Sequence, residues 1–237
     1  MKTYCKTINS ENAETVLPFV QDCFSTKWKR GDYQELLRAY SDKTPMEIKE
    51  LAARKNENRC KLFADELRGI AEDITKRIKE RDLRLEPVRY EMRIDGMSGK
   101  KREIGLESTM HQICDHAASG MLGELLTAKL SYYQCASIKG KGQVFGMRAI
   151  KKFIEKENYA ERMSKERGTP YANKAKYFVK ADIEKCYPSM TPEMVMRWLE
   201  RDIGKNKTLL WFIRELLTMH KHGLIIGSIL SKDLCNY

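Results

Sequence analysis

Hydrophobic positions recur at spacings of three and four over part of the first 85 residues, as in helices that bury one face. The clearest stripe consists of Phe63, Leu67, Ile70, Ala71, Ile74 and Ile78. Lysine, arginine, aspartate and glutamate fill the other faces of this segment. The pattern predicts a helical N-terminal extension, residues 1–85, whose apolar stripe packs on the rest of the chain.

The hydrophobic period changes to two after Val88. The alternating apolar positions are Tyr90, Met92 and Ile94. A glycine-containing turn at 96–99 and a basic run at 100–104 come next. This order predicts a β-hairpin whose second strand is basic.

A second helical pattern begins beyond the hairpin, with one apolar side. That side carries Met110, Ile113, Cys114, Ala117, Met121, Leu125 and Leu126. His111, Cys114 and His116 lie close together in this stretch, but positions five apart do not share a helix face well. Ordinary packing and solvation are therefore favoured there over metal binding.

The last hundred residues alternate between loops, helices and one β-rich run. Residues 137–143 form a glycine-spaced basic loop that lacks the order of a nucleotide-binding P-loop. A helix is predicted over 147–167, with a break at 168–170. The run 177–183 predicts a strand, and two helices with apolar faces come after it, the first beginning at Thr191 and Pro192.

Composition narrows the class of protein. The chain has 237 residues, 42% of them hydrophobic and 32% charged, and no apolar run approaches the roughly 18 residues of a membrane-spanning helix. The N-terminus lacks the apolar core of a secretory signal. The seven cysteines are scattered and form no Cys-x-x-Cys pair. These features predict a soluble cytoplasmic protein with reduced thiols and no membrane partner.

Positive charge is concentrated in one segment. The whole chain has 44 Lys+Arg against 33 Asp+Glu, a net charge of +11, and residues 136–180 contribute +8 of it. Aromatic residues are interleaved with these charges, as on a surface that follows a phosphate backbone. The candidate nucleic-acid-binding residues are Lys139, Lys141, Arg148, Lys151 and Lys152. A solvated helix face explains the same charges equally well.

Two motifs in the C-terminal third carry the strongest functional signal. The first is Ala181-Asp182-Ile183-Glu184-Lys185-Cys186-Tyr187, at the end of the β-rich run. The second is Gly223-Leu224-Ile225-Ile226-Gly227-Ser228, some forty residues later and beyond two helices. Their order and spacing resemble the palm of reverse transcriptases, the RNA-directed DNA polymerases, of the bacterial retroelement type found in retrons and group II introns.

The resemblance continues upstream and covers residues 88 to 237. The hairpin with Lys100, Lys101 and Arg102 looks like the fingers hairpin that holds the incoming triphosphate. The loop at 138–142 looks like the Gly-Arg-Gly-type loop that precedes the palm strand in such enzymes. The implied fold is α+β, with a helical extension at 1–85, a fingers-like region at 86–176 and a partial palm at 177–237.

The resemblance also implies the chemistry. Two Mg²⁺ ions would drive nucleotidyl transfer of deoxynucleotides to a primer 3′-hydroxyl on an RNA template, with Asp182 and the backbone carbonyl of Ile183 as metal ligands. Tyr187 would lie under the sugar and exclude a 2′-hydroxyl. Gly227 and Ser228 would let the nucleotide and template approach the backbone.

The sequence departs from the family pattern in two respects. Ile225 stands where a proline is usual, and Ile226 replaces a residue that is often polar. The Tyr/Phe-x-Asp-Asp motif that supplies the other metal carboxylates does not occur, and neither does a thumb. We therefore expect a truncated N-terminal portion of the polymerase, inactive alone, because one carboxylate cannot hold two Mg²⁺ ions against hydration.

Two other classes of protein stay open. One is a non-catalytic nucleic-acid-binding protein that uses the basic segment 136–180. The other is a palm polymerase that makes RNA.

Overall fold

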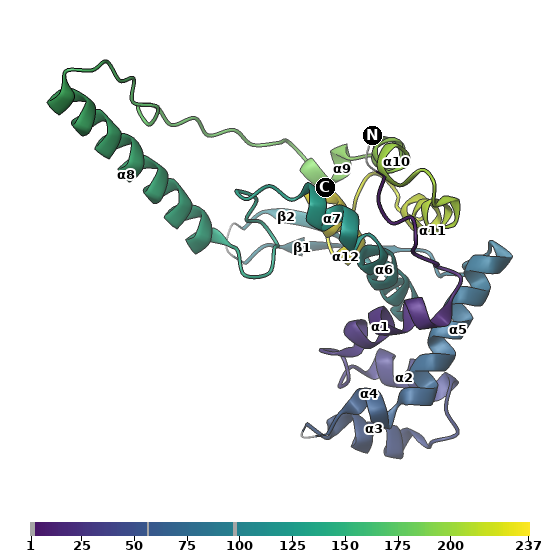
Figure 1. Cartoon of the computed structure of the whole chain (residues 1–237). Helices are drawn as coiled ribbons and strands as arrows, with labels where there is room; N and C mark the ends of the chain where they lie inside the picture. The colour runs from purple at the N-terminus through teal and green to yellow at the C-terminus, as the bar shows by residue number, and fades with distance from the viewer. Residues whose placement is uncertain (1–2, 56, 97–98) are drawn as a thin grey trace. The chain divides into compact units, whose positions relative to one another are not determined.

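The computed structural model describes residues 3–55, 57–96 and 99–237, and these divide into two compact units (Figure 1). The first unit contains the residues up to 128, residues 186–235 and Tyr237. The second contains residues 129–185 and Asn236. The described residues are mostly helical and form one two-stranded antiparallel sheet, which confirms the α+β class.

The described residues of the N-terminal segment form five helices, in line with the helical pattern of the sequence. They are α1 (Ala13–Phe24), α2 (Gly31–Ala39), α3 (Pro45–Ala53), α4 (Arg59–Leu62) and α5 (Ala64–Glu80). Side chains cap three of them: Asn12 at the start of α1, Thr44 in a reciprocal pair with Glu47 at the start of α3, and Asn58 at the start of α4. The whole apolar stripe of α5 is buried, and this helix packs against α1.

The predicted hairpin is confirmed. Strands β1 (Arg89–Ile94) and β2 (Lys101–Leu106) pair antiparallel, with Tyr90 opposite Gly105. The turn residues 97 and 98 lie outside the described residues. The hydroxyl of Tyr90 accepts a 2.7 Å hydrogen bond from the backbone N–H of Lys221, which ties the base of the hairpin to a connection far along the chain.

The second predicted helical stretch is also present, but as two helices. Helix α6 (Thr109–Met121) begins with Ser108 as its cap, and α7 (Gly123–Lys129) begins after Leu122. The apolar side of α6 is buried and contacts α1 and α11 (Lys207–Thr218). This helix therefore joins the N-terminal helices to the C-terminal ones within the first unit (Figure 1).

The C-terminal part of the first unit contains α9 (Cys186–Ser189), α10 (Pro192–Ile203), α11 and α12 (Ile229–Asn236). Thr191 caps α10 and Pro192 occupies its first turn, as predicted. Helices α10 and α11 pack against each other through their apolar faces. No helix in the described part of the chain is long and apolar enough to cross a membrane.

The second unit consists mainly of α8 (Gln143–Arg167) and the irregular segment after it. Gly168 ends this helix in a left-handed conformation, which confirms the predicted break. The predicted strand at 177–183 is wrong, because these residues form no regular structure. Tyr177, Phe178 and Val179 are exposed, and within the described ranges this run has no strand to pair with.

Candidate nucleotide pocket and buried histidine–carboxylate cluster

Residues 223–228, which we call the glycine segment, lie between the hairpin and the turn that contains Tyr187. The N–H of Leu224 donates to the carbonyl of Met190 at 3.0 Å. On the other side, the N–H of Gly105 donates to the carbonyl of Ile226 at 2.9 Å. These two backbone hydrogen bonds hold together three parts of the chain that the sequence motifs assign to one nucleotide pocket.

Both glycines of this segment are required by close backbone contacts. A Cβ atom on Gly223 would lie 2.5–2.7 Å from the carbonyl oxygens of Pro188, Met190 and Tyr187. Gly227 has a φ of +119°, and a Cβ there would lie 2.6 Å from the carbonyl oxygen of Gly105. The two glycines therefore permit the backbone approach that joins the segment to its neighbours.

Ser228 has a structural role at the end of this segment. It caps α12, and its buried hydroxyl donates to Oδ2 of Asp115 on α6. Its side chain is thus already engaged inside the protein. The predicted contact with a nucleotide stays a prediction, and it concerns the backbone of Gly227 and Ser228.

The basic strand presents its charges to solvent. Arg102 stands directly opposite Arg93 in the hairpin, and like charges in this position repel each other. Each is paired with a carboxylate, Arg102 with Asp95 at 3.1 Å and Arg93 with Glu91 at 3.2 Å. Lys100 and Lys101 are likewise exposed. The hairpin therefore offers several cations to an anionic ligand.

Tyr187 and Asp182, the two landmarks of the first palm motif, belong to different units. Tyr187 lies in α9 of the first unit, is partly buried and packs against the core, and burial raises the pKa of its hydroxyl. Asp182 and Ile183 are exposed in the second unit, where the carboxylate of Asp182 accepts from the Ile183 N–H at 3.1 Å.

The candidate nucleic-acid-binding residues lie in the second unit. Lys139, Arg148, Lys151 and Lys152 are exposed, the last three on α8. Lys141 instead donates at 2.8 Å to the carbonyl of Tyr132. Its ammonium group therefore closes the loop before α8, and a phosphate would have to compete for it.

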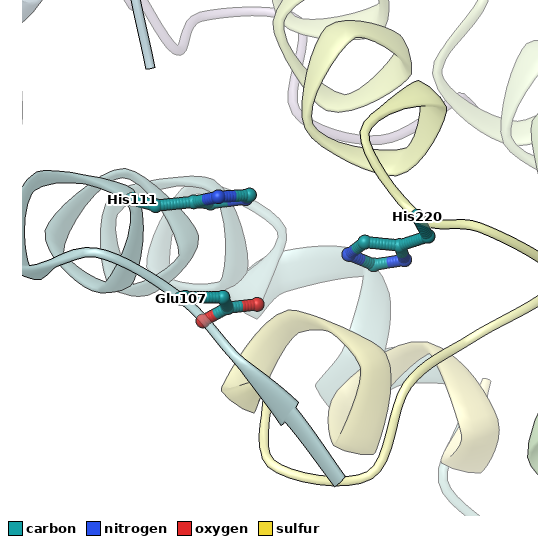
Figure 2. Close-up of side chains that lie close together, drawn as sticks. All are labelled: Glu107, His111 and His220. Atoms are coloured by element: carbon teal, nitrogen blue, oxygen red, sulfur yellow. The ribbon is translucent and has the colours of Figure 1, made fainter. Parts of the chain in front are cut away.

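A further polar cluster lies inside the first unit. Glu107 comes directly after β2, His111 lies in the first turns of α6, and His220 comes after α11. Each offers one ligand atom to a group in which all such atoms lie within 4.8 Å of one another. Figure 2 shows the three side chains pointing toward a common space. His111 is fully buried, and His220 is only 6% exposed.

Most polar atoms of this cluster have no hydrogen-bond partner. Seven buried side-chain nitrogen and oxygen atoms lack one in the described residues, and six of them belong to Glu107, His111, Asp115 and His220. Each such atom costs about 1–3 kcal/mol if it stays unsatisfied. A bound ligand would offset this cost.

Electrostatics favour the neutral imidazoles. Burial lowers the pKa of His111 to about 4, and the neighbouring His220 adds to this shift. Burial likewise lowers the pKa of His220 to about 4, against an opposing contribution from the backbone of Gly223. Burial raises the pKa of Glu107 and, with Glu107 as its neighbour, that of Asp115. Near neutral pH both histidines thus keep lone pairs that can bind a metal.

The sequence patterns do not predict this cluster. They group His111 with Cys114 and His116, its neighbours on the same helix. Cys114 is instead buried in the core, and His116 lies 3.8 Å from Asp22 and 3.5 Å from Lys27. The partner of His111 is His220, which only the tertiary fold brings close, and the one local signal is the histidine itself.

Comparisons with known proteins add no assignment. No protein-family model matches the chain, and no curated protein matches it either.

Proposed function

We propose that residues 88–237 form part of the nucleotide- and template-binding region of an RNA-directed DNA polymerase of the reverse transcriptase type. The observation that carries this proposal is the junction at the glycine segment. There, the backbone of the second palm motif is hydrogen bonded to both the basic hairpin and the Tyr187 turn. The glycine segment thus contacts both of the other motifs that the sequence selects for the same pocket.

Each residue of the pocket has a defined role in this proposal. Arg102, with Lys100 or Lys101, neutralises the triphosphate after its guanidinium leaves Asp95. The repulsion between Arg102 and Arg93 favours binding of an anion between them. The ring of Tyr187 lies under the sugar and disfavours ribonucleotides.

The catalytic metals are a separate matter. Mg²⁺ requires near-octahedral oxygen coordination and is slow to give up its water. Asp182 and the carbonyl of Ile183 supply only two oxygens, and the sequence contains no Asp-Asp pair. These residues are too few to hold two ions, so the chain binds primer, template and nucleotide in this proposal but does not catalyse transfer alone.

Formation of a ternary complex tests the nucleotide pocket. The purified chain is titrated with a fluorescent primer annealed to an RNA template, with and without the templated deoxynucleoside triphosphate and Mg²⁺. We expect the matched nucleotide to tighten primer–template binding and a mismatched one to have no effect.

Arg102→Gln should abolish the tightening of primer–template binding by the matched nucleotide. Arg54→Gln should preserve it, because Arg54 is also a half-exposed arginine paired with a carboxylate, Glu57, but lies at the end of α3 and not in the hairpin. Equal effects of matched and mismatched nucleotides would refute the pocket.

Primer extension tests the activity itself. We expect no synthesis by this chain, and synthesis when it is joined to a segment that carries the Tyr/Phe-x-Asp-Asp motif and a thumb. Asp182→Asn should then abolish synthesis. Robust extension by the chain alone would contradict the predicted inactivity.

A second function is favoured by the charge of the second unit. Helix α8 is exposed over most of its length and carries several lysines and arginines, of which Lys151 and Lys165 pair with glutamates one turn away. A protein that only binds nucleic acid would show salt-dependent affinity but no response to the templated nucleotide. The ternary-complex experiment therefore separates the two functions.

A further inference from the structure

We propose that Glu107, His111 and His220 form a binding site for a divalent transition metal ion of the zinc class, with Asp115 as the residue that orients His111. The site goes beyond the proposed polymerase function and does not depend on it. The observation that carries it is the common space enclosed by the three side chains (Figure 2).

The donor set selects the class of metal. Two imidazole nitrogens with one or two carboxylates are typical of Zn²⁺ and related ions, whereas Mg²⁺ and Ca²⁺ prefer oxygen ligands alone. Bonds of about 2.1 Å place the ligand atoms of a tetrahedral ion about 3.4 Å apart. The atoms here lie within 4.8 Å of one another, so small side-chain rotations close the site.

Unpartnered polar atoms favour a bound ion at this place. Both ring nitrogens of His111 and of His220, and one carboxylate oxygen of Glu107, are buried without a hydrogen-bond partner in the described residues. An ion held by one nitrogen from each histidine and by this oxygen gives partners to atoms that otherwise have none.

Asp115 is placed to position a ligand. Its Oδ1 lies 3.8 Å from Nε2 of His111, and its other oxygen is held by the Ser228 hydroxyl. This distance is longer than a hydrogen bond, and a rotation of the His111 ring that shortens it would let Asp115 fix the ring and its tautomer, as carboxylates beside metal-bound histidines do. The three ligands leave one position of a tetrahedral ion for water or a small ligand.

The ion would join segments that meet at the base of the hairpin. Glu107 comes directly after β2, and His220 directly precedes Lys221, whose N–H donates to Tyr90 on β1. Metal binding would therefore clamp the connection after α11 to both the hairpin and α6. The expected effect is greater stability of the first unit.

Cobalt binding tests the site directly. Protein stripped with a chelator is titrated with Co²⁺, whose visible absorption reports nitrogen and oxygen coordination, and then with Zn²⁺. We expect about one Co²⁺ per chain, displacement by Zn²⁺, no competition from excess Mg²⁺, and a higher melting temperature with either transition metal. These measurements use the unaltered chain, so they do not depend on any variant folding.

Variants then locate the ion. Glu107→Gln and His220→Gln should abolish binding of one ion per chain, and Asp115→Asn should weaken it by about 10–100-fold. His222→Gln is the matched control, because His222 is an exposed histidine close to His220 in sequence, outside the cluster. Circular dichroism of each variant checks that it is folded.

Three results would overturn the proposal. The first is an unaltered chain that takes up no Co²⁺ or Zn²⁺, which would mean that only water fills the space. The second is loss of binding in His222→Gln, which would place the ion at the surface. The third is full binding in a folded His220→Gln variant.

Discussion

Gly223→Ala offers the sharpest test of the glycine segment. The added Cβ would lie 2.5–2.7 Å from three backbone carbonyl oxygens, whereas carbon–oxygen contacts normally begin near about 3.3 Å. The overlap is thus about 0.6–0.8 Å with atoms that cannot rotate away. Backbone conformation adds nothing to the cost, because the φ of Gly223 is not in the left-handed region.

The expected loss of stability comes from these contacts. Overpacking of this kind costs about 1–3 kcal/mol. Moving the segments of chain apart also weakens the hydrogen bond from Leu224 to Met190, a further loss of about 1 kcal/mol. We therefore expect the free energy of unfolding to fall by about 3 kcal/mol and the melting temperature by about 6–12 °C.

Thermal and urea unfolding, followed by circular dichroism, measure this change. Gly123→Ala is the control, because nothing lies within 4 Å of a Cβ at this first residue of α7. That variant should be as stable as the parent or more stable by up to about 1 kcal/mol. If the two variants are equally stable, the close contacts around Gly223 do not exist as described.

Two further experiments probe packing and charge in the first unit. A Cβ on Gly120 would lie 2.2 Å from Cδ1 of Phe19, so Gly120→Ala should lower the unfolding free energy by about 2–3 kcal/mol, and Phe19→Leu should restore part of it in a double-mutant cycle. Burial alone would raise the pKa of Glu66, but hydrogen bonds from Lys43 and a serine lower it. The folded-state pKa of Glu66 thus lies below its unfolded value of about 4.3. Its contribution to the free energy of unfolding is fully present above about pH 4.3 and is lost as the pH falls through the folded-state pKa. Lys43→Met should cost about 1–2 kcal/mol at pH 7 and much less near pH 2 by urea unfolding, and an equal cost at both pH values would contradict this ion pair.

The local structure of the first unit could be predicted from sequence because its signals are local. The apolar stripe of α5 repeats at helical spacing, and every member of it is buried. Thr191 and Pro192 mark the start of α10 by side-chain and backbone chemistry that needs no distant partner. The hairpin is predicted by a period of two and a turn between its strands.

The strand expected at 177–183 shows where such reasoning fails. Its residues have high strand propensity, but a strand also needs a neighbour to satisfy its N–H and carbonyl groups. The described residues provide no such neighbour, and Tyr177 is 91% exposed. The residue types at 177–183 therefore indicate an apolar run with strand propensity, but they do not show which strand this run would pair with.

The histidine cluster and the Asp182 motif differ in how cleanly variants can test them. The hydrogen bond that Asp182 accepts comes from the N–H of the adjacent Ile183, and both residues are exposed, so Asp182→Asn should remove the proposed metal ligand and little stability. His111 and His220 are buried, and replacing either changes packing and polar satisfaction at once. Loss of synthesis in an extended chain with Asp182→Asn would therefore report on the chemistry. Loss of stability on replacing His111 or His220 would not distinguish a metal ligand from a core residue. The metal site must therefore be decided by titration of the unaltered protein, with variants used only to locate an ion already shown to bind.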